Sequence, residues 1–158
     1  MKIEYLADHP DYVPVLARWH YEEFKRLDPQ ATVEKYITKL RHTLRRGEIP
    51  TTFVALSGDT LLGSASLFHH DMSTREELAP WLAAVYVAPE YRRQGVGSAL
   101  VRRAVVEAKG IGIEKLYLYT PDMEHFYAQL GWSVLERTEY RGWKVIIMEI
   151  DLTGVTTR

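Results

Sequence analysis

The stretch "WLAAVYVAPEYRRQGVGSALVRRAVVEAKG", residues 81–110, decides the fold. It begins with Trp81–Val87, an apolar run rich in β-branched and aromatic residues and without a polar face, which is typical of a strand covered on both sides. From Gly97 onward the apolar residues recur at helical spacing, and Gly110 fits a C-terminal cap. Two arginines and two glycines stand between the two patterns. The stretch predicts a central strand that turns directly into a helix.

The turn at residues 92–98 has the composition of an anion site. The first N–H groups of a helix have no partner within the helix, and the helix dipole adds positive potential at the same place. Gly95 and Gly97 would let the backbone approach a phosphate without a Cβ in the way. Arg92 and Arg93 add charge and bidentate donors, which suit a diphosphate better than a carboxylate.

Other phosphate-binding motifs fit the letters less well. A Walker A loop needs Gly-Lys-Ser/Thr after a first glycine and four residues, and no such string occurs. A dinucleotide fingerprint needs a small residue where Leu100 stands, and it usually opens a chain with several βα units, whereas one is visible here. Incidental binding of an anion by an isolated G-x-G remains open at this point.

The rest of the chain alternates helical and strand patterns. We expect helices over residues 11–27, over 32–47 with Thr32 as N-cap, and within 121–131, and strands over 3–6, 51–56, 60–68, 115–120, 132–138 and 144–152. The strand at 115–120 should run parallel to Trp81–Val87, because a helix connects them. Residues 69–80 are predicted to form a loop, and "TGVTTR", 153–158, is expected to fray.

The composition is that of one ordinary folded domain over residues 1–158. Hydrophobic residues make up 46% and charged residues 26%, with 20 basic and 21 acidic side chains and a formal charge of −1. This balance gives no general attraction to nucleic acid or to a membrane surface. The absence of cysteine excludes disulfides and a cysteine nucleophile. Without an apolar segment of spanning length or a signal sequence, we expect a soluble cytoplasmic protein.

The motifs together resemble the GNAT superfamily of acyl-CoA N-acyltransferases. Its pyrophosphate motif is Arg or Gln, two residues, Gly, one residue, and Gly or Ala, and "RRQGVG", 92–97, satisfies each fixed position. The strand before it, the helix after it and "FYAQLGW", 126–132, are similar to that family as well. The resemblance implies an α/β (mixed α+β) GNAT fold: a twisted, mostly antiparallel sheet of about six or seven strands with one parallel βαβ crossover and about four helices.

The resemblance also implies a set of residues that bind acetyl-CoA. The backbone amides of Arg93, Gln94, Gly95, Val96, Gly97 and Ser98 would hold the pyrophosphate, with the side chains of Arg92 and Arg93 near the phosphates. Backbone groups of Val85, Tyr86 and Val87 would pair with the pantetheine arm as with an added strand. Phe126 would lie beside the cofactor, and Tyr127 would protonate the departing thiolate.

The implied reaction is direct attack of a neutral primary amine on the acetyl carbonyl, with a backbone N–H of the central strand stabilising the oxyanion. A base must first deprotonate the amine. Residues 82–89 contain no acid, and Thr120 and Met123 depart from the residues usual in the family, so the base must come from elsewhere. The candidates, each of which could equally be a solvated surface residue, are Glu22, Glu23, His70, Asp71, Glu76 and Glu77.

The remaining interpretations concern metals, acceptors and partners. His69, His70 and Asp71 are too few, and alternate in direction too much, for a metal site, so no metal is expected. His125 should face away from Tyr127 on a helix. An acidic loop beside an aromatic pocket suggests a cationic amine, most simply a small one, and a polyamine-like molecule, an amino sugar and a peptide N-terminus all fit this description. The tip "EYRGW", 139–143, could cover the acceptor or support a homodimer.

Three other functions remain compatible with the sequence: a non-catalytic acyl-CoA sensor or interaction module, an acetyltransferase that acts on protein N-termini or lysines, and a nucleotide-binding protein unrelated to CoA. The missing acid on the central strand motivates the first of these. Competition for the site by CoA, but not by ATP or NAD, would exclude the last.

Overall fold

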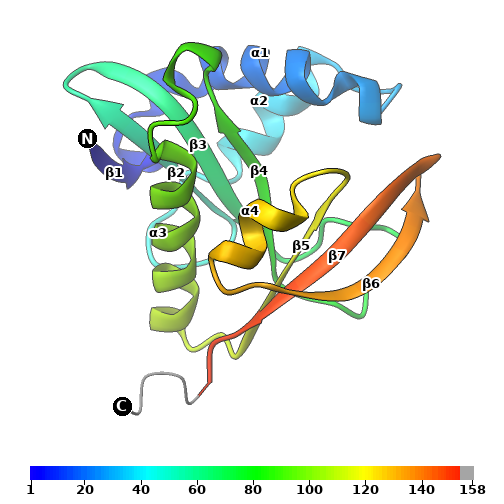
Figure 1. Cartoon of the computed structure of the whole chain (residues 1–158). Helices are drawn as coiled ribbons and strands as arrows, with labels where there is room; N and C mark the ends of the chain where they lie inside the picture. The colour runs from blue at the N-terminus through cyan, green and yellow to red at the C-terminus, as the bar shows by residue number, and fades with distance from the viewer. Residues whose placement is uncertain (154–158) are drawn as a thin grey trace.

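The computed structural model describes residues 1–153 and contains one seven-stranded sheet in the order β1-β2-β3-β4-β5-β7-β6 (Figure 1). Its strands are β1 Lys2–Tyr5, β2 Thr51–Ser57, β3 Thr60–Phe68, β4 Trp81–Val87, β5 Lys115–Thr120, β6 Ser133–Tyr140 and β7 Trp143–Asp151. All neighbouring strands are antiparallel except β4 and β5, which are parallel. The predicted mixed sheet with one parallel crossover is therefore confirmed.

Four α-helices flank the sheet within the described residues: α1 Val13–Phe24, α2 Val33–Arg41, α3 Val96–Ile111 and α4 Glu124–Gln129. The Thr32 hydroxyl caps α2, because its oxygen accepts a hydrogen bond from the Lys35 backbone N–H at 3.1 Å. Arg103 and Glu107 form the predicted ion pair one turn apart on α3, at 2.9 Å. Within residues 1–153, no helix is both long enough and apolar enough to cross a bilayer.

Several helix ends differ from the sequence prediction. The first helical segment is α1 flanked by two 3-10 turns, Pro10–Tyr12 and Lys25–Leu27. The second helix stops at Arg41 and does not continue to residue 47. The Thr43 side chain and backbone N–H both donate to the Leu40 carbonyl, at 2.6 and 2.9 Å, and this closes the helix early.

The C-terminal cap of α3 was also predicted at the wrong glycine. Gly110 lies inside the helix, and Gly112 is the capping residue, with φ +99°. The N–H of Ile113 donates to the Ala108 carbonyl at 3.0 Å across this turn, so the left-handed residue satisfies a carbonyl that the helix leaves free.

The last hairpin turns tightly at Arg141 and Gly142, which both have positive φ. Two such residues form a turn whose twist matches paired strands, so β6 and β7 stay paired up to Tyr140 and Trp143, the residues on either side of the turn. The strands therefore begin and end one or two residues away from the predicted 132–138 and 144–152. The tip "EYRGW" consists of two strand ends and a two-residue turn.

The sheet separates two helical layers (Figure 1). On β2, Val54 and Leu56 pack in the cluster that contains α1 and α2, whereas Phe53 and Ala55 pack in the cluster that contains α3. Successive residues of a strand point to opposite faces, so one buried strand contributes to both layers. This explains why β2 reads as an apolar run without alternation.

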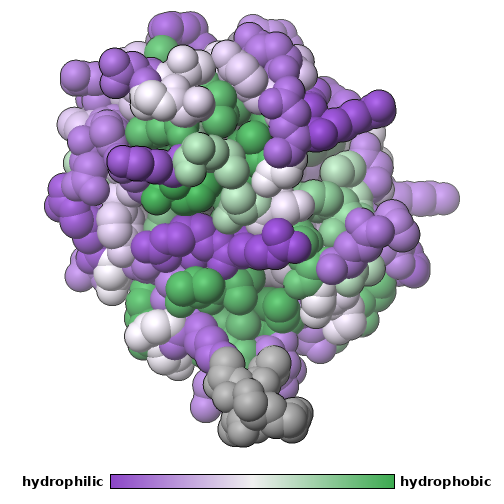
Figure 2. Space-filling model, turned by 60° about the vertical axis from the view of Figure 1, so that its left-hand side comes forward, coloured by the Kyte–Doolittle hydropathy of each residue, from purple (hydrophilic) through white to green (hydrophobic). Residues whose placement is uncertain are grey.

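Figure 2 brings the left-hand side of Figure 1, where α3 lies, toward the viewer. Apolar areas on this face are divided by a band of hydrophilic residues. On α3 the exposed apolar residues are Val106 and Ile111. The division is typical of a surface that faces water.

Candidate active site

The two edges of β4 are unequally paired. Against β3 the strand pairs from Trp81 to Val87, but against β5 the only registered pair is Trp81 with Tyr117. Figure 1 shows β4 and β5 diverging from that point. From Leu82 onward, the β4 edge that faces β5 thus has no strand partner among the described residues. Unpaired backbone groups of this kind can bind an extended, amide-bearing molecule as an added strand.

A β-bulge lies in the middle of this open edge. Ala84 and Val85 together oppose the single residue Ala65, and Ala84 has φ +53°. A non-glycine residue in this conformation costs about 1–3 kcal/mol and usually marks a functional constraint. The bulge changes the direction in which the backbone groups of β4 point along the cleft.

The turn after β4 leads directly into α3 with its amide groups free. Arg93 and Gly95 have positive φ, +64° and +85°, and α3 starts at Val96. Since the first N–H groups of a helix have no intrahelical acceptor, those of Val96 to Ser98 are available for an anion. A Cβ on Gly97 would lie 3.5 Å from the Phe126 ring, an ordinary contact distance, so Phe126 of α4 packs directly beside the turn.

The two arginines of the turn have different environments. The Arg92 Nε donates to the Val87 carbonyl at 2.8 Å, its guanidinium lies over the Tyr86 ring, and its Nη2 is 3.5 Å from a Glu23 carboxylate oxygen. Arg93 makes no ion pair with another described residue. Arg92 thus connects β4 to the end of α1, and Arg93 is the arginine of the pair that is free to meet a phosphate.

A cavity of about 350 Å³ opens beside the β4 bulge. Its apolar floor consists of the β4 residues Leu82 to Val85 together with Leu118 of β5, and its walls come from α1, α2, the β5–α4 connection and the β6–β7 turn. Segments far apart in the sequence therefore meet at this point. The volume falls within the range of small-molecule sites.

Tyr127 lies in this cavity. Its side chain is 8% exposed, its ring packs edge-on against Phe126, and its hydroxyl has no hydrogen-bond partner among the described residues. Burial raises the pKa of the Tyr127 hydroxyl well above its usual value. The hydroxyl therefore stays protonated at neutral pH and can donate a hydrogen bond or a proton into the cavity.

Of the six candidate bases, Glu23 and Asp71 line the cavity. Glu22 instead pairs with Lys25 at 2.8 Å on the surface of α1, and His70, Glu76 and Glu77 are exposed and away from the cavity. Burial raises the pKa of the Asp71 carboxyl, while Lys39 and Arg141 act in the opposite direction. Asp71 has no ion pair or hydrogen bond with another described residue.

Four more residues line the cavity with Asp71: Tyr36, Lys39, Tyr119 and Arg141. Of these, only Arg141 belongs to a segment expected from the sequence as a possible cover of the acceptor, the tip "EYRGW". They come from α2, β5 and the β6–β7 turn. Burial, and then the charge of Asp71, raise the pKa of the Tyr119 hydroxyl. Tyr36 stands on the predicted apolar stripe of its helix and Arg141 at the predicted hairpin tip, whereas no sequence signal marked Lys39 and Tyr119, which join the cavity only through the tertiary fold.

A buried histidine supports the cavity wall from behind. His20 of α1 is 1% exposed, its Nε2 is 2.9 Å from the Ser64 hydroxyl, and it packs edge-on against Tyr36 and Tyr86. Burial, and to a smaller extent Lys39, lowers the pKa of His20 to about 3. The ring is therefore neutral at physiological pH and holds the α1 and α2 wall against β3 and β4.

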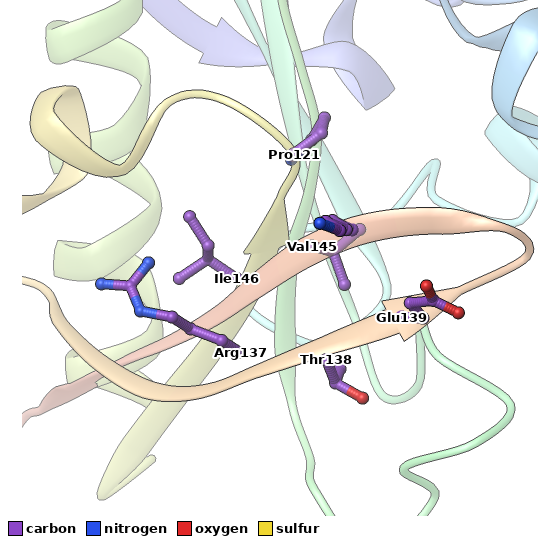
Figure 3. Close-up of a pocket in the computed structure, with 7 residues that line it drawn as sticks. Pro121, Arg137, Thr138, Glu139, Val145 and Ile146 are labelled. Carbon is purple, nitrogen blue, oxygen red and sulfur yellow. The ribbon is translucent and has the colours of Figure 1, made fainter.

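A second hollow, of about 430 Å³, lies on the last hairpin (Figure 3). Arg137, Thr138 and Glu139 of β6 and Val145 and Ile146 of β7 line it, with Pro121 above them. It contains no residue of β4, of the turn before α3 or of α4. The hollow therefore lacks the donors and the tyrosine that distinguish the cavity beside the bulge.

Metal ligands do not gather in the described part of the chain. Residues 1–153 contain no group of three His, Asp or Glu side chains arranged to hold a metal ion. The His69 ring nitrogen lies 3.1 Å from the Ile49 carbonyl, to which it can donate. His125, which was expected to face away from Tyr127, is exposed.

The sequence matches the acetyltransferase (GNAT) family over residues 13–132. The chain therefore belongs to this family, which uses acetyl-CoA as acyl donor, and the resemblance inferred from the motifs is confirmed. An amino-acid acetyltransferase of Aeromonas salmonicida (strain A449) is 32% identical over 76 residues, which are 48% of this chain and 16% of that protein. The chain thus spans a small part of that relative's length.

Solved structures share the fold over nearly the whole chain. An acetyltransferase from Exiguobacterium sp. 255-15 is 26% identical, with a TM-score of 0.69, over 99% of this chain and 98% of its own. The yncA protein of Salmonella typhimurium, solved with its cofactor acetyl-CoA, is 14% identical, with a TM-score of 0.73, over 98% and 95% of the two chains. The second likeness concerns the fold alone.

Proposed function

We propose that this protein transfers the acetyl group of acetyl-CoA to a primary amine of a small molecule. The open edge of β4 beside the amide-rich turn before α3 carries the proposal. An acyl-CoA combines an amide-bearing arm with a diphosphate. The open edge of β4 matches the arm, and the amide-rich turn that follows it matches the diphosphate.

The donor would be bound largely by main-chain groups. Backbone groups of Val85, Tyr86 and Val87 are proposed to pair with the pantetheine arm, and the amides from Arg93 to Ser98 to hold the pyrophosphate. Arg92 supports this arrangement from behind, because its bond to the Val87 carbonyl fixes the end of the strand where the turn begins. Phe126 packs beside Gly97 and closes the turn from the α4 side.

The acetyl group would lie near the β4 bulge, within reach of Tyr127. When the neutral amine attacks, an N–C bond forms, the C–S bond breaks, and the amine loses a proton. The Tyr127 hydroxyl, which burial keeps protonated, is proposed to donate its proton to the departing sulfur. Glu23, at the α1 wall beside Arg92, is proposed to accept the amine's proton directly or through water.

The names of other structures with this fold do not select one acceptor. Among them are an aminoglycoside 6'-acetyltransferase at 19% identity and a spermidine N-acetyltransferase chimera at 16% identity. A ribosomal-protein-alanine N-acetyltransferase from Brucella melitensis, at 16% identity, has the same fold. The proposal of a small amine therefore rests on the size of the cavity and not on these names. The side chains of the cavity must supply the finer specificity.

Tyr127→Phe tests the proposal because it removes the hydroxyl and keeps the ring. We expect thiol release from acetyl-CoA with an amine panel at pH 8 to fall at least about 100-fold, with CoA affinity by calorimetry within about twofold. Tyr12→Phe, at a surface tyrosine that donates to the Asp59 carbonyl, is the matched control and should keep full turnover. Equal turnover of the Tyr127→Phe variant and the native protein would remove Tyr127 from this role, and absence of CoA binding in the native protein would overturn the proposed function.

A further inference from the structure

One end of the cavity carries a mixed charged and aromatic group that the proposed transfer does not use. We call it the head-group end and define it as Tyr36, Lys39, Asp71, Tyr119 and Arg141. All five line the cavity, and three separate segments of the chain and the loop after β3 bring them together. Such convergence on one spot is typical of a recognition site.

The anion of the head-group end has no partner in direct contact. Asp71 forms no ion pair or hydrogen bond with another residue in 1–153, and burial raises its pKa even though Lys39 and Arg141 are near. A desolvated carboxylate without a hydrogen bond is costly. An incoming ammonium would supply the missing partner, and the partly buried Tyr36 and Tyr119 rings offer faces that attract a cation.

The cations of the head-group end are only weakly engaged. Arg141 lies 3.5 Å from Asp28, a loose pair, and the Lys39 ammonium lies over the Phe68 ring at 4.7 Å without a carboxylate in contact. Arginine binds a carboxylate through two parallel N–H donors. The head-group end can thus accept a carboxylate on Arg141 and Lys39 beside an ammonium on Asp71.

The head-group end and the proposed reaction centre line the same cavity beside β4. Tyr119 contacts Trp81 at the start of β4, with ring centroids 6.2 Å apart, and its pKa responds to Asp71. Glu23 is linked through Arg92 to Tyr86 and Val87 at the other end of the strand. Because β4 and β5 are parallel with Trp81 opposite Tyr117, Tyr119 stands level with Ala83, and its ring leans back toward Trp81. The apolar floor formed by Leu82 and its neighbours lines the same cavity.

We propose that the acceptor is an α-amino acid with a second, terminal amine: its α-ammonium and α-carboxylate bind at the head-group end, and its terminal amine attacks the acetyl group. This inference rests on the proposed function. A methylene chain would cross the apolar floor. The new N–C bond then forms on the terminal nitrogen, the C–S bond breaks, and the α-amine, held as an ammonium, is not acetylated.

Three acceptors that share a terminal amine test the head group. Lysine carries both α-groups, 6-aminohexanoate lacks the α-ammonium, and 1,5-diaminopentane lacks the carboxylate. We expect kcat/KM for lysine to exceed that of each of the other two at least tenfold, with the product acetylated on the terminal nitrogen by mass spectrometry. Equal values for lysine and 1,5-diaminopentane would overturn the proposal.

Two variants assign the two α-groups to their residues. In Asp71→Asn, lysine and 6-aminohexanoate should become equal. In Arg141→Asn, the preference for lysine over 1,5-diaminopentane should fall at least about fivefold, with Lys39 still able to attract the carboxylate. Asparagine suits position 141 because it tolerates the positive φ of +53° there. Glu114→Gln and Arg41→Gln, at exposed positions outside the cavity, are matched controls that should keep the lysine preference.

Binding measurements keep this inference separate from the proposed function. Calorimetry with lysine and with 1,5-diaminopentane, in the presence of CoA, measures how the α-groups change binding affinity in the absence of turnover. If lysine binds more tightly than 1,5-diaminopentane and both Asp71→Asn and Arg141→Asn reduce that difference, the head-group inference is supported. This holds even if no amine is acetylated, a result that would by itself refute the proposed transfer. Turnover of 1,5-diaminopentane in preference to lysine would support the transfer and refute the head-group inference.

Discussion

The two sides of the cleft beside β4 are built from different material. The proposed donor side consists of main chain: an open strand edge, a bulge at Ala84 and the turn before α3 with left-handed residues at Arg93 and Gly95. The proposed acceptor side consists of side chains from α1, α2, the loop after β3 and the β6–β7 turn. Backbone geometry should therefore control donor binding, and side-chain chemistry should control the choice of acceptor.

The largest effect should come from straining the donor-side main chain. Gly95 has φ +85°, a conformation that a β-branched residue adopts only under strain, and no atom lies within 4 Å of an added Cβ. Gly95→Val should weaken CoA binding about 100-fold, or about 2.7 kcal/mol, because the amides of the turn would move. Calorimetric titration with CoA measures this directly.

Gly112 provides the matched control for that experiment. It has φ +99°, equally open surroundings and a place at the opposite end of the same helix. Gly112→Val should reduce the free energy of unfolding by about 2 kcal/mol, as Gly95→Val should, but leave CoA affinity within about twofold. A similar loss of CoA binding in both variants would mean that general destabilisation, and not the turn, controls affinity.

An intermediate effect should appear on the acceptor side at low pH. His20 has a pKa of about 3 in the folded chain, below the usual 6.5, so the unfolded chain binds an extra proton between these values. The contribution of His20 to the free energy of unfolding is therefore fully present above pH 6.5 and is lost as the pH falls toward 3. Between pH 6.5 and 5 this residue alone should lower the free energy of unfolding by about 2 kcal/mol.

Denaturant titrations of the native protein and of His20→Leu at several pH values isolate this contribution. The variant loses the Ser64 contact and should be less stable at pH 7. The slope of its free energy of unfolding against pH should correspond to about one proton fewer taken up on unfolding than in the native protein. If both proteins show the same pH dependence, His20 is not the group that responds to acid.

The smallest effect should distinguish the two arginines of the turn. Arg93→Gln should weaken CoA binding about fivefold and reduce the salt dependence of binding, because an exposed charge near a phosphate acts through screened attraction. Arg92→Gln should instead lower the thermal midpoint by a few degrees, since Arg92 donates to the Val87 carbonyl and contacts Tyr86. Equal effects of both substitutions on the salt dependence would erase this distinction.

The donor side follows closely from the sequence because it is local. Trp81–Val87, the turn and α3 are contiguous, so strand composition, glycine positions and helical spacing could all be read from one stretch. The order of elements and the parallel pair of β4 with β5 followed from the same pattern. Gly112 as the cap of α3 was missed because Gly110 also ends an apolar stripe, and the choice depends on backbone conformation.

The acceptor side could be predicted only in part. Glu23 and Asp71 were two of six candidate bases, and nothing in their neighbours separated them from Glu22 or Glu76. Tyr119 and Arg141 become neighbours of Asp71 only because β5 and β7 pair and the last hairpin bends toward α2. Long-range pairing of this kind leaves no periodic signal in one sequence. The bulge at Ala84 was likewise invisible, since an alanine gives no sign of positive φ.

The two-residue turn at Arg141 and Gly142 has an evolutionary consequence. This turn contributes to the cavity from a hairpin that lies outside the stretch from β4 to α4 that forms the donor side. Under the proposed function, replacement of a single turn residue, or a change in the length of that hairpin, should therefore alter the choice of acceptor and leave the residues proposed to bind acetyl-CoA unchanged. A fold organised in this way can diversify its substrates without giving up its chemistry.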